Sequence, residues 1–276
     1  MIKIITDSAA DLPGYLLTEK HIDIARLEVR LGSHDKELLS AMDGKQFWEI
    51  VQNTDGVPQT SAPSPGTFAE LFTAAKEEGY DGALCITLAS GFSSTYEAAL
   101  VGAKTVEDFP IEIIDSKSVT LGEGLLVLFA SKLAESGAKL PEIVDQVCQK
   151  RDKIKILAVL DTLEYLKLGG RIGPLSSMIG SLLSVKPIIE IKSSEIIPVS
   201  KQRTRSKAVD FLVDLLKNTK NIEQVAVVHS EAPDIERVLD MISPVTNGDN
   251  TLVSYIGPVI GAYSGPGTIG FCIIEK

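Results

Sequence analysis

Hydroxyl and acidic side chains recur directly after short apolar segments of this sequence. They are Thr6, Asp7 and Ser8; Thr60 and Ser61; Ser93, Ser94 and Thr95; and Asp115, Ser116 and Ser118. Loops that follow strands are where α/β proteins build binding sites. The same residue types also cap helices and stabilise turns, so each group alone is ambiguous. For Ser8 and Ser116 we favour the structural role.

Ser93 differs from the others because it stands at the start of a helical segment. The run from Ser90 to Thr95 opens a stretch that we expect to be helical. The first turn of a helix has free backbone N–H groups and the positive end of the helix dipole, and both attract anions. A carboxylate headgroup fits this environment.

General acid–base chemistry has few candidate residues here. The chain has three histidines, His21, His34 and His229, and none lies in a recognisable catalytic motif. We interpret His21 and His34 as surface residues. His229 ends an apolar segment, where loop residues often line sites, but we favour a structural role for it as well.

The sequence gives no support for nucleotide binding, for hydrolase catalysis or for metal binding. Gly265, Gly267 and Gly270 have the GxGxxG spacing, but only six residues follow, too few for a dinucleotide-binding helix. No GxxxxGK[ST] or GxSxG motif occurs. The three cysteines are far apart and odd in number, which fits reduced thiols better than disulfides or metal ligands. We expect no cofactor and no metal.

The charge and the hydropathy of the sequence disfavour nucleic acid as a partner and a span across a membrane. Lys and Arg number 27 against 37 Asp and Glu, and the net charge of -10 disfavours nucleic acid. No apolar run is long enough to cross a membrane, and the first residues lack the pattern of a signal peptide. We expect a cytoplasmic protein.

Apolar segments of strand length alternate with amphipathic segments of helix length, which predicts an α/β protein. The 276 residues favour two domains, and we place them at 1–153 and 154–276. We expect a three-layer, mostly parallel sheet in the first, a smaller mixed sheet with helices in the second, and a ligand between them. Predicted strands are Ile2 to Ile5, Ile22 to Leu31 with a bend near Ala25, Gly82 to Leu88, Ile111 to Ile114, Lys155 to Leu160, Pro187 to Ile191, Ile196 to Val199, Val225 to His229, Leu252 to Ile256 and Thr268 to Ile274.

Seven segments of the sequence stand out when they are taken together. They are IITDSAADLP from Ile4, QTSAPSPGTF from Gln59, SGFSSTYEAA from Ser90, IIDS from Ile113, DTLEYLKLGGRIG from Asp161, VKPII from Val185 and IGPVIGAYSGPGTIG from Ile256. In combination they resemble the DegV family of bacterial fatty-acid-binding proteins, of the type that carries lipid for a fatty acid kinase. Each piece alone is weak, but together, and in family order, they are highly specific.

The resemblance implies two α/β lobes with an acyl chain in an apolar tunnel. It also implies that Thr60, Ser61 and Ser93 hold the fatty-acid carboxylate, and we add Ser94, Tyr263 and Arg203 to this set. Met178, Ile179, Leu182 and Leu183 are our candidates for the tunnel lining, although the stretch Leu175 to Val185 fits a plain core helix equally well. The implied ligand is a long-chain fatty acid such as palmitate or oleate.

The resemblance further implies a role in lipid transport or fatty acid metabolism. Family members of this type deliver the lipid to a separate ATP-dependent kinase, which makes an acyl phosphate, and the carrier is not itself catalytic. We assign Arg171 to contact with the partner or the phosphoryl group. Tyr263 stands where many relatives have a histidine, and Ser94 where glycine is common. Since tyrosine supplies no positive charge at neutral pH, Tyr263 bears on delivery to the kinase more than on lipid binding.

Two other functions stay open. A small-molecule enzyme acting in the cleft between the domains would need a base near Ser93, for which His229 and Asp115 are the candidates. A lipid-responsive regulatory protein would use the same ligand as a signal.

Overall fold

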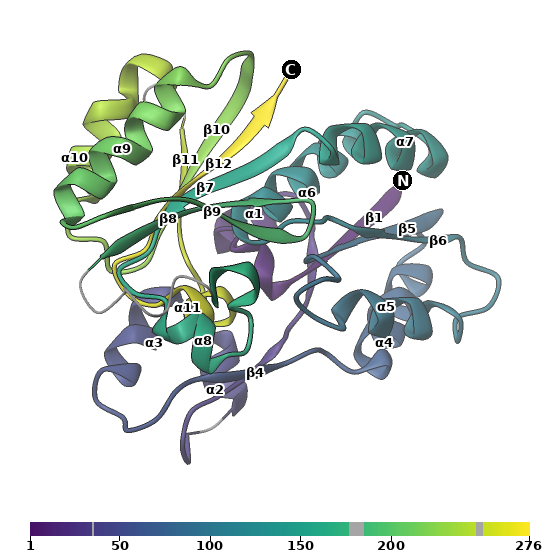
Figure 1. Cartoon of the computed structure of the whole chain (residues 1–276). Coiled ribbons are helices and arrows are strands. Elements are labelled where there is room, and N and C mark those ends of the chain that lie inside the picture. Colours follow the sequence, from purple (N-terminus) through teal and green to yellow (C-terminus); the bar gives the residue numbers. More distant parts are fainter. Residues whose placement is uncertain (35, 177–184, 247–250) are drawn as a thin grey trace. The chain divides into compact units, whose positions relative to one another are not determined.

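The computed structural model of the chain describes residues 1–34, 36–176, 185–246 and 251–276 (Figure 1). The chain folds into two compact units. Unit 1 contains Met1–Glu28 and Thr60–Asp152, and unit 2 contains Val29–Gln59 and Lys153–Lys276. Residues 29–59 therefore pack with unit 2, whereas the sequence analysis placed them in the first domain. Hydrophobic periodicity is local and does not tell which of two cores a helix joins.

Unit 1 is built on a parallel four-stranded sheet with the order β2-β1-β5-β6. Its strands are β1 (Ile2–Asp7), β2 (Asp23–Ala25), β5 (Gly82–Thr87) and β6 (Ile111–Asp115). β1 and β5 are buried along their whole length, as central strands covered on both faces should be. The carboxyl ends of β1, β5 and β6 meet at one edge, because Thr6 pairs with Ile86 and Thr87 pairs with Asp115.

Helices cover both faces of this sheet (Figure 1). α4 (Pro65–Glu77) and α5 (Thr95–Ala103) lie on one face, and α6 (Thr120–Glu135) and α7 (Leu140–Arg151) lie on the other. The short η1 (Ser8–Ala10) and α1 (Gly14–Glu19) follow β1. On the α4 and α5 face, Ile5 and Cys85 of the sheet pack against Phe68 and Phe72. The predicted three-layer arrangement is confirmed.

The predicted strand from Ile22 to Leu31 is divided in two. β2 ends at Ala25, and β3 (Glu28–Arg30) pairs with β4 (Gln59–Ser61) in a separate two-stranded sheet. The break falls at the predicted bend. The chain leaves unit 1 within β3 and returns to it within β4.

Unit 2 is built on a mixed six-stranded sheet with the order β11-β10-β12-β7-β8-β9. Its strands are β7 (Ile154–Val159), β8 (Lys186–Lys192), β9 (Glu195–Gln202), β10 (Ile222–His229), β11 (Leu252–Tyr255) and β12 (Ile269–Glu275). β10 and β11 are parallel, and the other pairs are antiparallel. This sheet is larger than the parallel sheet of unit 1, not smaller as we expected, because antiparallel neighbours such as β8 and β9 are joined by a short turn and need no crossover helix.

The helices of unit 2 form two groups. α9 (Arg205–Asn218) and α10 (Ile235–Ile242) cover one face of the sheet, where Val209 and Leu212 of α9 and Val238 of α10 pack on Val227 and Phe271 (Figure 1). The 3-10 turn η3 (Ser243–Val245) follows α10. α2 (Lys36–Ala41), α3 (Gly44–Val51) and α8 (Glu164–Leu168) contact α11 (Pro258–Ser264).

Candidate functional site

The loop after β5 is fixed to both neighbouring strands of unit 1. Three successive backbone N–H groups donate hydrogen bonds outward from it. Leu88 donates to Asp7 Oδ2 at 2.8 Å, Ala89 to the Ser118 carbonyl at 2.8 Å and Ser90 to Asp115 Oδ1 at 3.2 Å. The Ser90 hydroxyl also donates to Asp115 Oδ2 at 2.6 Å. This loop runs directly into Ser93 and α5.

Ser93 lies immediately before the N-terminus of α5. Its hydroxyl is 2.9 Å from the Thr95 hydroxyl, and the side chain is half-buried. Ser94 is the N-cap residue, but its exposed side chain makes no capping hydrogen bond. The N–H groups of this first turn are therefore not satisfied by the cap side chain, which is the condition for binding an anion.

Thr60 and Ser61 lie in β4, just before α4. Thr60 is half-buried, and the exposed Ser61 donates a hydrogen bond of 3.3 Å to Glu28 Oε2. Ser64 caps α4 by accepting from the Thr67 N–H. α4 and α5 pack closely, because a side chain at Gly102 would overlap the Pro65 carbonyl oxygen. Both predicted hydroxyl motifs thus belong to unit 1 and precede helices that touch.

Two buried acids lie where β1 meets α6. Asp7 accepts hydrogen bonds from the N–H groups of Ala9 and Leu88, and Glu123 Oε1 accepts one from the Thr6 hydroxyl at 2.9 Å. Burial raises the pKa of Asp7 to about 7 against the pull of its two N–H donors. Burial and the Asp7 charge raise the pKa of Glu123 well above its usual range. Since Asp7 has the two N–H donors, Glu123 is the member of the pair that stays protonated near pH 7.

The structural roles of Ser8 and Ser116 are confirmed. Ser8 Oγ accepts from the Leu27 N–H at 3.0 Å, and Ser116 Oγ bridges the backbone of Ser118. Asp115 is likewise engaged, since it accepts from Ser90 and from the Lys117 N–H at 2.8 Å. An acid held in this way is poorly placed to serve as a base.

In unit 2, Arg171 and Tyr263 are brought together. The guanidinium of Arg171 lies over the Tyr263 ring at 5.1 Å, a cation–π contact, and it donates to the Gly169 carbonyl at 2.8 Å. A side chain at Gly169 would overlap the same ring, so the GGR segment requires glycine at its first position.

Arg203 is exposed in the turn before α9. The arginine with several acidic partners is Arg205, two residues further on. Its side chain donates to Asp161 Oδ1 at 2.6 Å, to both oxygens of Asp234 at 2.6 and 3.0 Å, and to the Gly267 carbonyl. Arg205 therefore joins the end of β7 and the start of β12 to the starts of α9 and α10.

The three histidines differ in surroundings. His21 and His34 are exposed, as predicted. His229 is half-buried at the end of β10, with its ring 4.6 Å from that of Tyr255, and its Nδ1 is buried without a hydrogen-bond partner in the described chain. Burial lowers the pKa of His229, and the hydroxyl of Tyr255 donates to Glu231.

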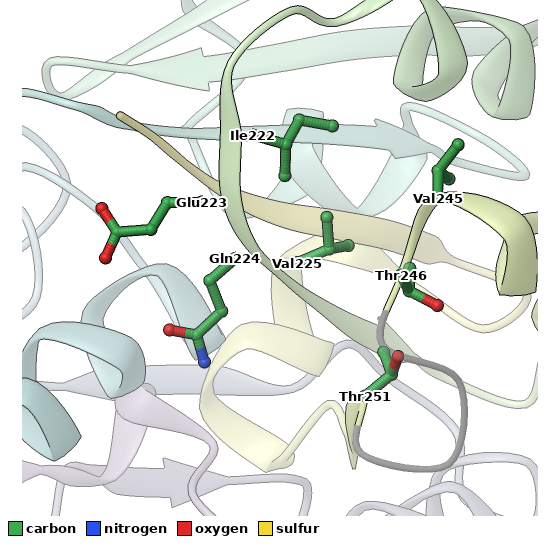
Figure 2. A pocket seen from close by; sticks show the side chains of 7 residues that line it. All are labelled: Ile222, Glu223, Gln224, Val225, Val245, Thr246 and Thr251. Carbon is green, nitrogen blue, oxygen red and sulfur yellow. The ribbon is translucent and has the colours of Figure 1, made fainter.

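The tunnel residues Met178, Ile179, Leu182 and Leu183 lie outside the described residues. A pocket of about 310 Å³ occurs elsewhere in unit 2, at the amino ends of β10 and β11. Its lining comprises Ile222, Glu223, Gln224, Val225, Val245, Thr246 and Thr251, with Glu223 and Gln224 extending away from Thr246 (Figure 2). None of the predicted site residues lines it. His229 and Tyr255 are at the opposite ends of the same strands.

Metal clusters and membrane-spanning helices are both absent from the described residues. No cluster of three or more His, Cys, Asp or Glu side chains in the described ranges is arranged to hold a metal ion. Among the helices in the same ranges, none is long and apolar enough to cross a membrane.

The fold and the loop at the edge of the parallel sheet define a two-unit α/β protein with a site suited to an anion. The chain belongs to the DegV family, since the family model described as "Uncharacterised protein, DegV family" matches residues 1–276. A DegV domain-containing protein of Clostridium acetobutylicum is 32% identical over 100% of this chain and 99% of its own. Protein DegV of Bacillus subtilis is 30% identical over 98% of this chain and 98% of its own.

Solved structures of the family match the whole fold. DegV from Bacillus subtilis, described as a fatty acid binding protein, has a TM-score of 0.88 at 29% identity and covers 100% of this chain and 99% of its own. A fatty-acid-binding DegV family protein from Thermus thermophilus has a TM-score of 0.87 at 26% identity with the same coverage. A stearic acid-binding protein from Eubacterium ventriosum has a TM-score of 0.85 at 27% identity, again with 100% and 99% coverage.

We had grouped Asp7 and Asp115 with the loop residues without assigning them a role in holding the site, and we had not singled out Glu123 or Arg205. Asp7 and Asp115 carried a signal, because each follows an apolar strand and precedes a serine in TDS and IDS. Glu123 gave no signal, since an acid in the first turn of a helix is normally a surface residue favoured by the helix dipole. The burial of Glu123 follows from the packing of α6 on the sheet, which the local sequence does not show.

Proposed function

We propose that this protein binds a long-chain fatty acid such as palmitate or oleate, with the carboxylate at the N-terminus of α5. The observation that carries the proposal is the first turn of α5, which has no side-chain cap and follows a half-buried Ser93 in a firmly held loop. Fatty-acid binding by family members of the same fold supports the choice of ligand. Thr60, Ser61, Ser94, Tyr263 and Arg203 stay as predicted carboxylate contacts.

The two ends of the ligand have different roles in this proposal. Burial of some fifteen methylenes at roughly 0.8 kcal/mol each supplies most of the affinity. Hydroxyl and backbone N–H donors add less, but they fix the position of the carboxylate. Met178, Ile179, Leu182 and Leu183 remain our proposed lining of the acyl tunnel.

We further propose that the protein is a non-catalytic cytoplasmic carrier that presents the carboxylate to an ATP-dependent fatty acid kinase. An ionised carboxylate needs placement, not deprotonation, to accept a phosphoryl group. The engagement of Asp115 by Ser90 and Lys117 supports a carrier over an enzyme that uses this acid as its base. The exposed Arg171 is the proposed contact with the kinase or the phosphoryl group.

Native mass spectrometry of the purified protein tests the ligand directly. We expect a mass increase that matches one long-chain fatty acid, which denaturing extraction should release for identification. An empty protein that also takes up neither palmitate nor oleate would overturn the proposal.

The site itself is tested by Ser93→Ala in delipidated protein. We expect palmitate affinity to fall about tenfold, the usual effect of removing a hydrogen bond to a charged group. Ser206→Ala on the exposed surface of α9 is the matched control and should bind as the native protein does. Unchanged affinity in Ser93→Ala would exclude Ser93 as a carboxylate contact.

A further inference from the structure

The position of Ser93 depends on acids that do not contact the ligand in the proposed site. Between the end of β5 and Ser93, the backbone N–H groups of Leu88, Ala89 and Ser90 are each bound by a different neighbouring segment. The two outer bonds go to carboxylates, Asp7 at the end of β1 and Asp115 at the end of β6. Because β5 lies between β1 and β6 in the sheet, the loop is held on both sides, by Asp7 of β1 and by Asp115 of β6.

We propose that Asp7 and Asp115 are positioning residues for the lipid carboxylate site, and that Asp7 makes this positioning dependent on pH. The inference rests on the proposed function, because it assumes that Ser93 and the first turn of α5 receive the carboxylate. It adds two residues whose effect on binding passes through the loop 88–94.

Asp7 is the acid that can change state. It is fully buried, and both oxygens are used, Oδ1 by the Ala9 N–H at 2.9 Å and Oδ2 by the Leu88 N–H at 2.8 Å. A protonated carboxyl has one oxygen that donates, so only one of the two N–H groups keeps a good acceptor. Protonation therefore weakens either the turn at Ala9 or the anchor at Leu88.

The titratable groups that the structure records beside Asp7 are Glu123 of α6 and Cys85 of β5, and the charge of Asp7 raises the pKa of both. Asp11, at the end of η1, acts in the same direction on Glu123. Burial and the nearby acids raise the pKa of Cys85, so the thiol stays neutral. With its pKa raised to about 7 by burial, Asp7 titrates in the neutral range.

Binding and stability respond to this titration with opposite signs. An acid whose pKa is higher in the folded state contributes stability that is complete below its unfolded pKa and lost as pH rises through the folded value. Acidification from about pH 8 to 6 thus makes the Asp7 contribution to stability larger. The same acidification removes an acceptor from the loop, so lipid affinity falls. A purely structural role for Asp7 would not produce this opposition.

The test measures palmitate affinity of delipidated protein at pH 6, 7 and 8 for the native chain, Asp7→Asn, Asp115→Asn and Asp145→Asn. Asp145 is exposed on α7 and serves as the control for any pH effect on the lipid itself. We expect the native protein and Asp145→Asn to lose about fivefold to tenfold in affinity from pH 8 to pH 6. Asp7→Asn should bind palmitate at all three pH values as weakly as the native protein does at pH 6, so its affinity should not change with pH. Asp115→Asn should be weaker throughout and keep the slope.

Asp7→Asn and Asp115→Asn affinities equal to the native values at all three pH values would overturn the inference while leaving the proposed function intact. A native protein that binds no palmitate at any pH would instead remove the proposed function. If a variant does not fold, Ser90→Ala decides, because it removes only the 2.6 Å hydrogen bond to Asp115. Unchanged affinity in Ser90→Ala together with a flat native profile would then reject both positioning roles.

Discussion

The two arginines of residues 201–207 differ in what they contact. Arg203 is exposed, whereas only 17% of the Arg205 side chain is accessible and its donors reach Asp161 and Asp234. Loss of one partner from a buried ion pair leaves the remaining charges without compensation, which costs more than the pair contributes. Without Arg205, Asp234 would be left in that state, whereas Asp161 would keep its ion pair with Lys186 at 3.3 Å.

Arg205→Gln should lower the free energy of unfolding of unit 2 by about 2 kcal/mol, because Asp234 loses its charged donor and Asp161 keeps Lys186 as its cationic partner. Arg203→Gln is the matched control and should change it by less than about 0.5 kcal/mol. Urea unfolding followed by circular dichroism measures both. Equal effects of the two substitutions would contradict this account of Arg205.

Tyr263→Phe separates the hydroxyl of Tyr263 from its ring. The ring would remain under the Arg171 guanidinium, but the predicted hydrogen bond to the lipid carboxylate would be lost. We expect palmitate affinity to fall about tenfold with an unchanged thermal midpoint, as measured by calorimetry. Tyr15→Phe, at an exposed tyrosine of α1, is the control. Native affinity in Tyr263→Phe would remove Tyr263 from the predicted carboxylate set.

Local residue chemistry predicted some roles and not others. The turn roles of Ser8 and Ser116 followed from residue type and spacing. The choice of arginine did not, since residues 203 and 205 differ only in their distance from acids far along the chain. No local pattern encodes that distance.

α3 shows what sequence periodicity omits about an element. Asp is a residue type favoured at helix N-caps, and Asp43 accepts from the Gln46 N–H at the start of α3. Its partner was not predicted: Phe47 and Trp48 are buried in unit 2, where they approach Gly261 of α11. The buried face of a helix specifies that a partner exists, but not which one.

Gly44, the first residue of α3, should not accept a side chain. A Cβ at this position would overlap the Ile256 carbonyl oxygen and the Tyr255 ring, and a backbone atom cannot move aside as a flexible side chain can. We expect Gly44→Ala to lower the free energy of unfolding by about 1–3 kcal/mol, the usual effect of overpacking. Gly14→Ala in α1, where nothing lies within 4 Å, is the control and should be neutral or slightly stabilising. Equal thermal midpoints for the two variants would show that α3 is not held as closely as the structure has it.

The alternation of strands and helices along the chain was predictable from the sequence, but the unit to which each segment belongs was not. All four strands of the parallel sheet and all six of the mixed sheet overlap segments predicted to be extended, although several, such as β9 and β10, are longer than predicted. The overlap arises because a buried strand needs a short apolar run bounded by turn residues. The assignment of residues 29–59 to unit 2 has no comparable signal in the sequence. It depends on which core accepts Phe47 and Trp48.

The buried acids of unit 1 predict how the whole protein responds to pH. Burial raises the pKa of Asp7 to about 7 and the pKa of Glu123 well above its usual range. Their contribution to stability is therefore complete below the pKa values of the unfolded chain, near pH 4, and each acid loses its share as pH rises through its folded pKa. Glu123→Gln removes one of the two acids and keeps an oxygen to accept from Thr6. The variant should therefore be more stable than the native protein at pH 8, by about 1–3 kcal/mol, and the difference should shrink by pH 5.

Calorimetric thermal midpoints at pH 5, 6.5 and 8 measure this difference, with Glu70→Gln on the exposed surface of α4 as the control. Glu123 Oε2 has no hydrogen-bond partner in the described chain, so an amide there breaks no existing bond. A variant less stable than the native protein at pH 8 would contradict this prediction, because it would mean that Glu123 does not destabilise the folded protein at that pH. A gain at pH 8 that is absent at pH 5 would place the repulsion between the two acids in the folded protein, because the unfolded chain keeps them apart in solvent.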